Sequence, residues 1–195
     1  MATAPVFKRG ATPEDRLAVP DQMVAEIVDG DLYASPRPSL LHARAASTLN
    51  ADLAGPFDRG RGGPGGWWLL QEPELHFGED VLVPDVAGWR RERLPRIPDT
   101  PATDLAPDWV CEVISPSTER LDRVHKLAVY AREGVAHAWL VNPTQRTLEV
   151  YRREGRAWLL VASHADDALV RAEPFAAVEI DLLALWGEER SQAQP

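Results

Sequence analysis

Two acidic residues and a lysine have the types and spacing to act together: Asp85 after Pro84, Glu112 inside an apolar run, and Lys126 further along. A carboxylate such as Glu112 within a strand-forming run is costly unless a cation or several hydrogen-bond donors meet it. Two carboxylates can clamp a hard divalent cation such as Mg²⁺ (or Mn²⁺), which also binds phosphate oxygens. A metal held in this way lowers the pKa of a bound water and neutralises charge on a scissile phosphate. A lysine beside it can stabilise the transition state.

The residues around this trio also have plain structural interpretations, which the sequence leaves open. Glu112 is equally explained as a buried glutamate paired with an arginine or a lysine. Asp122 precedes Lys126 by one helical turn, so the two can form an exposed ion pair worth only tenths of a kcal/mol. Glu26 alternates with apolar neighbours and fits an exposed strand carboxylate, and His42 fits a surface residue in the first turn of a helix.

The elements expected to position these residues are strands interleaved with helices. A hairpin with Asp29-Gly30 as its two-residue turn carries Glu26 on its first arm. Asp85 ends a strand just after Pro84, within the strand-like run 81–89. The stretch 109–141 reads as a strand containing Glu112, a helix stopped by Gly134 in the left-handed position after its last turn, and a second strand.

The remaining elements follow from turn and capping residues. Thr12 caps a predicted short helix with Pro13 at its first position, and the glycine-dense residues 55–66 predict a mobile loop. The other expected elements are a helix over 39–54, strands over 67–71 and 74–77, an irregular proline-rich connection over 90–108, a hairpin over 148–162, and a closing strand with a short helix before residue 187.

Length and composition indicate the domain organisation and the general class of the protein. With 195 residues, 45% of them hydrophobic and 26% charged, the chain is predicted to form one domain over residues 12–187, with a flexible tail over 1–11 and a polar tail over 188–195. No apolar run approaches the ~20 residues of a membrane span. The N-terminal segment lacks an apolar signal core, so we expect a cytoplasmic protein.

The net charge of −9 argues against broad, charge-driven binding of nucleic acid, which needs a basic surface. Local clusters of arginine offset this objection in part. One cluster follows the predicted Asp85 strand, so its loop should start near the metal and could contact the phosphates of DNA; its members are Arg90, Arg91, Arg93 and Arg96. An ordinary solvated surface is the alternative interpretation of this cluster.

Six blocks of the sequence resemble the Uma-two family, a bacterial group of restriction-endonuclease-like proteins placed in the PD-(D/E)XK nuclease superfamily. The match extends over roughly residues 12–187 in the family's order, and its blocks are EIVDGDL, SPRPSLLH, VPDVAGW, PDWVCEVISPST, LDRVHKLAVYAREGV and AWLVNP. The resemblance implies an α/β (α+β) fold with a restriction-endonuclease-like core, in which a mixed β-sheet is flanked by helices. It also implies a Mg²⁺-dependent phosphodiesterase site.

Carried over residue by residue, the resemblance makes Asp85 the acid of the PD element and Glu112 the second acid, both metal ligands. The lysine expected two positions after the second acid is absent, because Ile114 stands there. Lys126 matches a lysine that recurs on the following helix of the family. Glu26 matches an early family glutamate and could complete the site. His42 matches a family histidine without an assigned role, and it and Asp122 are possible further metal ligands.

We therefore expect a Mg²⁺-dependent endonuclease that hydrolyses DNA through a two-carboxylate-plus-lysine site. A homodimer is the expected assembly, and no membrane partner is expected. The alternative is a non-catalytic protein that keeps the nuclease fold for nucleic-acid binding or assembly. The acidic balance favours that alternative, whereas the joint presence of two acids and a lysine favours the enzyme. The three side chains of an enzyme should converge within about 4–6 Å.

Overall fold

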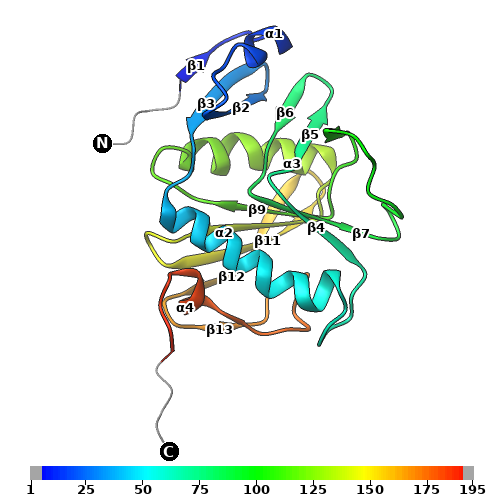
Figure 1. Cartoon of the computed structure of the whole chain (residues 1–195), viewed down its shortest axis with the longest axis vertical. Coiled ribbons are helices and arrows are strands. Elements are labelled where there is room, and N and C mark those ends of the chain that lie inside the picture. The colour runs from blue at the N-terminus through cyan, green and yellow to red at the C-terminus, as the bar shows by residue number, and fades with distance from the viewer. Residues whose placement is uncertain (1–5, 191–195) are drawn as a thin grey trace, which may run out of the picture.

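The computed structural model describes residues 6–190, which form two six-stranded sheets, a two-stranded sheet and the helices around them (Figure 1). The first large sheet has the strand order β1-β3-β2-β6-β5-β8 and the second β12-β11-β10-β9-β7-β4. Within the described residues no helix has the length and apolar character needed to cross a membrane. The predicted mixture of strands and helices, with mixed sheets flanked by helices, is confirmed.

The second sheet forms the centre of the molecule. Its strands are β4 (Trp67–Gln71), β7 (Val86–Arg90), β9 (Trp109–Val113), β10 (His137–Asn142), β11 (Thr147–Glu154) and β12 (Ala157–Ala165). β9 and β10 run parallel, as a strand–helix–strand unit requires, and β7 runs antiparallel to β9. All five residues of β9 are buried, so this strand is covered on both faces.

Two apolar cores cover the two faces of this sheet. On one face, β9 packs against α2 (Leu40–Leu53) and α4 (Leu182–Leu185), and Trp109 contacts Trp139 and Phe175 edge-on. On the other face lie α3 (Leu127–Glu133) and part of the first sheet. Figure 1 shows α2 and α3 on opposite sides of the central strands. The two-stranded sheet, β13 (Leu169–Val170) and β14 (Ile180–Asp181), leads into α4.

The first sheet begins with the predicted hairpin. β2 (Met23–Val28) and β3 (Asp31–Pro36) pair around Asp29-Gly30, and both turn residues have positive φ, as the tight hairpin turn requires. The sheet is completed by β1 (Val6–Lys8), β5 (Glu74–Phe77), β6 (Asp80–Leu82) and β8 (Ala102–Thr103). Thr12 caps α1 (Pro13–Leu17) through a capping box with Asp15, as predicted.

Several element boundaries differ from those expected. The flexible tail predicted through residue 11 instead contains β1, which pairs with β3; residues 1–5 lie outside the described part of the chain. In the predicted polar tail, Glu188 and Arg190 form ion pairs with Arg146 and Asp181, and residues 191–195 are not described. The predicted loop 55–66 begins with a π-helical turn, η1 (Ala54–Asp58), because Phe57 is buried against Phe175.

The run 81–89 forms two strands in different sheets, not one. β6 ends at Leu82 and β7 begins at Val86, and Val83–Asp85 carries the chain from the first sheet to the second. Pro84 lacks a backbone N–H and cannot pair in a ladder, so the break falls there. Asp85 therefore precedes β7 instead of ending a strand, and it lies where the two sheets meet.

Candidate active site

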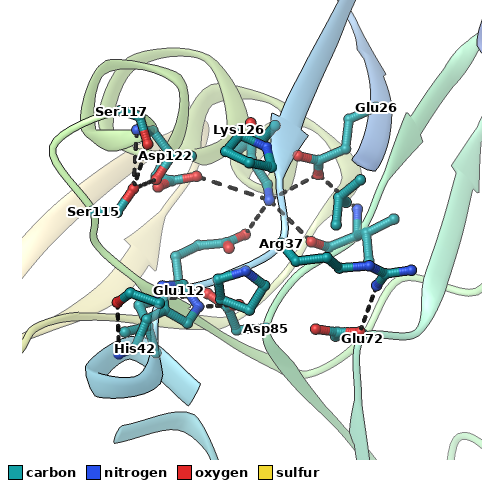
Figure 2. Close-up of a pocket in the computed structure, with 18 of the residues that line it drawn as sticks. Glu26, Arg37, His42, Glu72, Asp85, Glu112, Ser115, Ser117, Asp122 and Lys126 are labelled. Carbon is teal, nitrogen blue, oxygen red and sulfur yellow. Dashed lines mark hydrogen bonds and ion pairs between the residues drawn. The ribbon is translucent and has the colours of Figure 1, made fainter. Parts of the chain in front are cut away.

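The Lys126 ammonium lies at the centre of a cluster of acidic side chains (Figure 2). Its Nζ atom is 2.8 Å from Glu26 Oε1, 3.0 Å from Glu112 Oε1 and 3.9 Å from Asp122 Oδ1. It also donates a hydrogen bond of 3.1 Å to the carbonyl oxygen of Val83. These four ionisable side chains are each at most 7% exposed. The exposed interpretations of Glu26 and of the Asp122–Lys126 pair are therefore wrong.

Three elements bring this cluster together. Glu26 projects from β2, Glu112 from β9, and Asp122 and Lys126 from a π-helical segment, η2 (Leu121–Lys126), that precedes α3. A π-helical segment inside a helix is uncommon and often marks a functional site. Tyr130, on the next helical turn, donates a hydrogen bond of 2.6 Å to Glu112 Oε1. Tyr130 is not predicted from residue spacing, because its contact with Glu112 depends on how the helix packs on β9.

Strand pairing places Asp85 beside Glu112. In the antiparallel register of β7 and β9, Val86 is opposite Cys111, so Asp85, the residue before β7, lies at the level of Glu112, and its charge helps to raise the pKa of Glu112. Asp85 Oδ2 accepts a hydrogen bond of 2.7 Å from the Val113 N–H. The two acids predicted to share a metal thus both line one pocket.

His42 belongs to the same site and is not a surface residue. Ser39 caps α2, and in the first turn of that helix His42 Nε2 lies 2.7 Å from Asp85 Oδ1. The His42 side chain is only 12% exposed. Burial lowers the pKa of His42. The hydrogen bond between the ring and Asp85, together with the charge of that carboxylate, raises the pKa by a larger amount, so the net shift is upward. A histidine hydrogen-bonded in this way fixes the orientation of its carboxylate.

The acidic cluster holds more negative charge than Lys126 can balance. Burial, with the charges of neighbouring carboxylates, raises the pKa of Glu112 well above its usual range, although Lys126 opposes the shift. Burial likewise raises the pKa of Asp122 to about 7. Burial pushes the pKa of Lys126 down, but Glu112 and Glu26 raise it more, so the ammonium stays protonated. The excess charge favours binding of a proton or a further cation.

This imbalance predicts how stability depends on pH in the metal-free protein. Because the pKa of Asp122 rises from 3.8 to about 7 on folding, the folded state keeps a proton between those pH values that the unfolded state has released. The free energy of unfolding should therefore fall as the pH rises through this window. Asp122→Asn should flatten the fall, and Asp99→Asn, an exposed control, should not. Urea unfolding in EDTA at several pH values measures both, and identical slopes for the two variants would contradict the assignment.

The donor set fits a hard divalent cation bound partly through solvent and phosphate. Among residues 6–190 no three His, Cys, Asp or Glu side chains are grouped so as to form a complete metal site. Mg²⁺, however, is usually bound through one or two carboxylates and keeps several waters. Asp85 and Glu112 offer those two carboxylates within an anionic pocket. Ser35 Oγ, which is buried and has no hydrogen-bond partner in the described part of the chain, also belongs to a residue that lines this pocket.

The arginine cluster does not lie beside the carboxylates. Asp85 precedes β7 and Arg90 ends it, so five residues of extended chain, roughly 16 Å, separate them. The expectation that the loop starts near the metal is therefore wrong. Three of the four arginines already have partners: Arg90 lies over Trp67, Arg91 binds Asp58 at 2.8 Å and stacks on Trp68, and Arg93 lies 3.0 Å from Asp108. Arg96 is exposed, and contact of the cluster with DNA stays a prediction.

The fold and the pocket define an α/β protein of the restriction-endonuclease-like class. The chain belongs to the Uma2 family, described as "Putative restriction endonuclease", whose family model matches residues 13–184. The family that the sequence blocks indicated is confirmed.

One solved structure with the same fold is the crystal structure of "a putative nuclease belonging to DUF820" from Anabaena variabilis. It aligns with a TM-score of 0.73 and 22% identity, over 91% of this chain and 98% of the other. No curated protein matches the chain.

Proposed function

We propose that this protein is a metal-dependent nuclease that hydrolyses phosphodiester bonds of DNA at the pocket formed by Asp85, Glu112 and Lys126. The observation that carries the proposal is the cluster itself: a buried lysine shared by three carboxylates, with a further acid paired to a histidine. A purely structural ion pair needs one acid for each lysine, because unbalanced buried charge is costly. The family description, "Putative restriction endonuclease", supports the same reaction class.

Asp85 and Glu112 would hold Mg²⁺ (or Mn²⁺), which when bound supplies a water of lowered pKa and stabilises negative charge on the scissile phosphate. The chain's own residues have distinct tasks around that position. His42 and the Val113 N–H fix the two oxygens of Asp85, and Tyr130 fixes Glu112. The Lys126 ammonium, held by Glu26 and the Val83 carbonyl, places a fixed positive charge beside the reacting phosphate.

Asp122 is the candidate for proton transfer. Its pKa of about 7 lets it take up or release a proton near neutral pH, which is the range in which a general acid or base works best. It lies within reach of the Lys126 ammonium but forms a longer contact, 3.9 Å, than Glu26 or Glu112. The task of Asp122 in the proposed reaction is therefore to hold the proton, while the task of Glu26 is to position the lysine.

Metal binding is expected to stabilise the fold. A cation that binds only the folded state raises the free energy of unfolding by mass action, by about 2.7 kcal/mol at a hundred times its Kd. Thermal melts in EDTA and over a series of Mg²⁺ and Mn²⁺ concentrations should therefore show a rising midpoint. Asp85→Asn should reduce the rise, whereas Asp99→Asn should leave it intact. A midpoint that stays constant over the whole series would contradict a metal site.

Cleavage tests the proposed reaction directly. Labelled DNA, offered as a single strand and as a duplex, should be cut in at least one form in Mg²⁺ or Mn²⁺ and in neither form in EDTA. If the melts respond to metal but neither form of DNA is cut, the fold serves nucleic-acid binding or assembly without catalysis, which the net charge of −9 also favours. The expected homodimer stays a prediction that sedimentation can test.

A further inference from the structure

The pocket over the acidic cluster is small and has walls from three parts of the chain. Its volume is about 330 Å³, near the lower end of the ~300–1,000 Å³ found for small-molecule sites. One wall is the segment 35–39 between β3 and α2, which we call the strap. The opposite side is the turn 115–118 after β9, and the remainder includes the acidic cluster, Asp85 and His42.

The strap is held in place by its own side chains. Arg37 donates a hydrogen bond of 3.1 Å to the Asp21 carbonyl and lies 3.9 Å from Glu72, and Ser39 caps α2. Pro36 and Pro38 restrict the strap backbone on either side of Arg37. Figure 2 shows Arg37 extending toward Glu72, beside the acidic cluster. The strap is therefore a fixed wall of the pocket.

Access to the carboxylates is correspondingly limited. The Glu112 side chain is 3% exposed and that of Asp85 is 18% exposed. A flexible single strand, which can bend at one phosphate, therefore reaches these carboxylates more readily than a rigid duplex does.

The pocket offers few basic groups to a nucleic acid. Arg37 is the one arginine, and Lys126 the one lysine, among the described residues that line it. Duplex binding normally draws on a wide basic surface that contacts many phosphates, and the arginine cluster after β7 lies at the far end of that strand. One exposed guanidinium, with the hydroxyl groups of Ser115, Ser117 and Thr118 across the pocket, suits one or two phosphates of a flexible strand.

Resting on the proposed function, we infer that the substrate is single-stranded DNA, or a strand freed from pairing, which enters the pocket beside the strap and is positioned by Arg37. The scissile phosphate lies at Asp85 and Glu112, and a neighbouring phosphate contacts the Arg37 guanidinium. The turn 115–118 supplies uncharged hydrogen-bonding groups to the strand. Arg37 is a positioning residue in this arrangement, since it touches a phosphate that does not react.

Binding tests this inference separately from catalysis. Fluorescence anisotropy of one labelled oligonucleotide, alone and annealed to its complement, is measured in Ca²⁺, which takes the same oxygen ligands as Mg²⁺. We expect the single strand to bind at least about tenfold more tightly, a difference of 1.4 kcal/mol. Equal or tighter binding of the duplex, or no binding of the single strand, would overturn the inference. Single-strand binding without cleavage in Mg²⁺ or Mn²⁺ would instead contradict the proposed nuclease activity, while the inferred preference for a single strand would still hold.

A matched pair of variants tests the task of Arg37. Arg37→Gln should weaken single-strand binding and reduce the slope of log K against log salt by about 0.7, the value for one phosphate contact on a single strand. Arg61→Gln removes the same charge from the exposed loop beyond the other end of α2, about 20 Å from the pocket, and should leave the slope unchanged. Equal slopes for the two variants would overturn the assignment of Arg37.

Discussion

Replacement of Lys126 by methionine is expected to lower the free energy of unfolding by about 3–5 kcal/mol at pH 8, as for the loss of one partner from a buried ion pair. The Lys126 ammonium lies within 3.0 Å of both Glu26 and Glu112 and is 3% exposed. Its loss leaves buried carboxylates without a counter-ion. Because small domains are stable by only about 5–15 kcal/mol, the variant should unfold at a much lower urea concentration, measured in EDTA.

The chain offers a matched control, since Lys8 is its one other lysine. Lys8 is 53% exposed and pairs with Asp15, so Lys8→Met should cost less than about 1 kcal/mol. The deficit of Lys126→Met should also shrink as the pH falls, because the stranded carboxyl groups then take up protons. If Lys126→Met unfolded like the wild type at pH 8, the lysine would not be the counter-ion of the cluster, and the site described above would be wrong.

The fold could be predicted in large part from local sequence signals. The hairpin around Asp29-Gly30, the capped helix at Thr12 and the end of α3 at Gly134 all have short-range causes, and the structure shows each of them. The break at Pro84 was missed because 81–89 reads as one apolar run. Only the assembly of two sheets shows that β6 and β7 belong to different ones.

The sequence could predict which side chains gather at the pocket, but it could not predict that they are buried. The family's sequence blocks pointed to Asp85, Glu112 and Lys126, and the structure places all three at one pocket. From the sequence alone, Glu26 and His42 fitted surface residues, since alternation and helix position do not say what covers a face. Lys126 and Asp122 fitted an exposed pair for the same reason. Burial arises when β2, β9 and η2 pack together, and no segment contains that information by itself.

The arginine cluster shows the opposite failure, in which closeness in sequence was taken for closeness in space. Arg90 follows Asp85 by only five residues, but those residues form an extended strand that carries the chain away from the pocket. Arg37 is far from Glu112 in sequence, yet it lines the same pocket, because the segment between β3 and α2 passes over the end of β9. Basic residues near a site are therefore identified from topology, not from runs of charge.

Replacement of Glu112 by glutamine is expected to abolish cleavage while keeping the protein folded. The amide keeps the shape of the side chain and can still accept hydrogen bonds from Tyr130 and Lys126, but it removes one of the two carboxylates proposed to hold the metal. Removal of a buried charge whose pKa is already raised well above its usual range should cost little stability and could increase it. In the metal series, the midpoint of the melt should respond less than in the wild type.

The combination of outcomes separates catalysis from folding. Glu79→Gln makes the same chemical change in an exposed turn between β5 and β6 and should cut, melt and respond to metal as the wild type does. Loss of a metal-positioning group that acts in the transition state reduces the rate by orders of magnitude, at 1.36 kcal/mol for each factor of ten. Cleavage by Glu112→Gln at the wild-type rate would remove Glu112 from the reaction, and with it the central reason for placing the metal between β7 and β9.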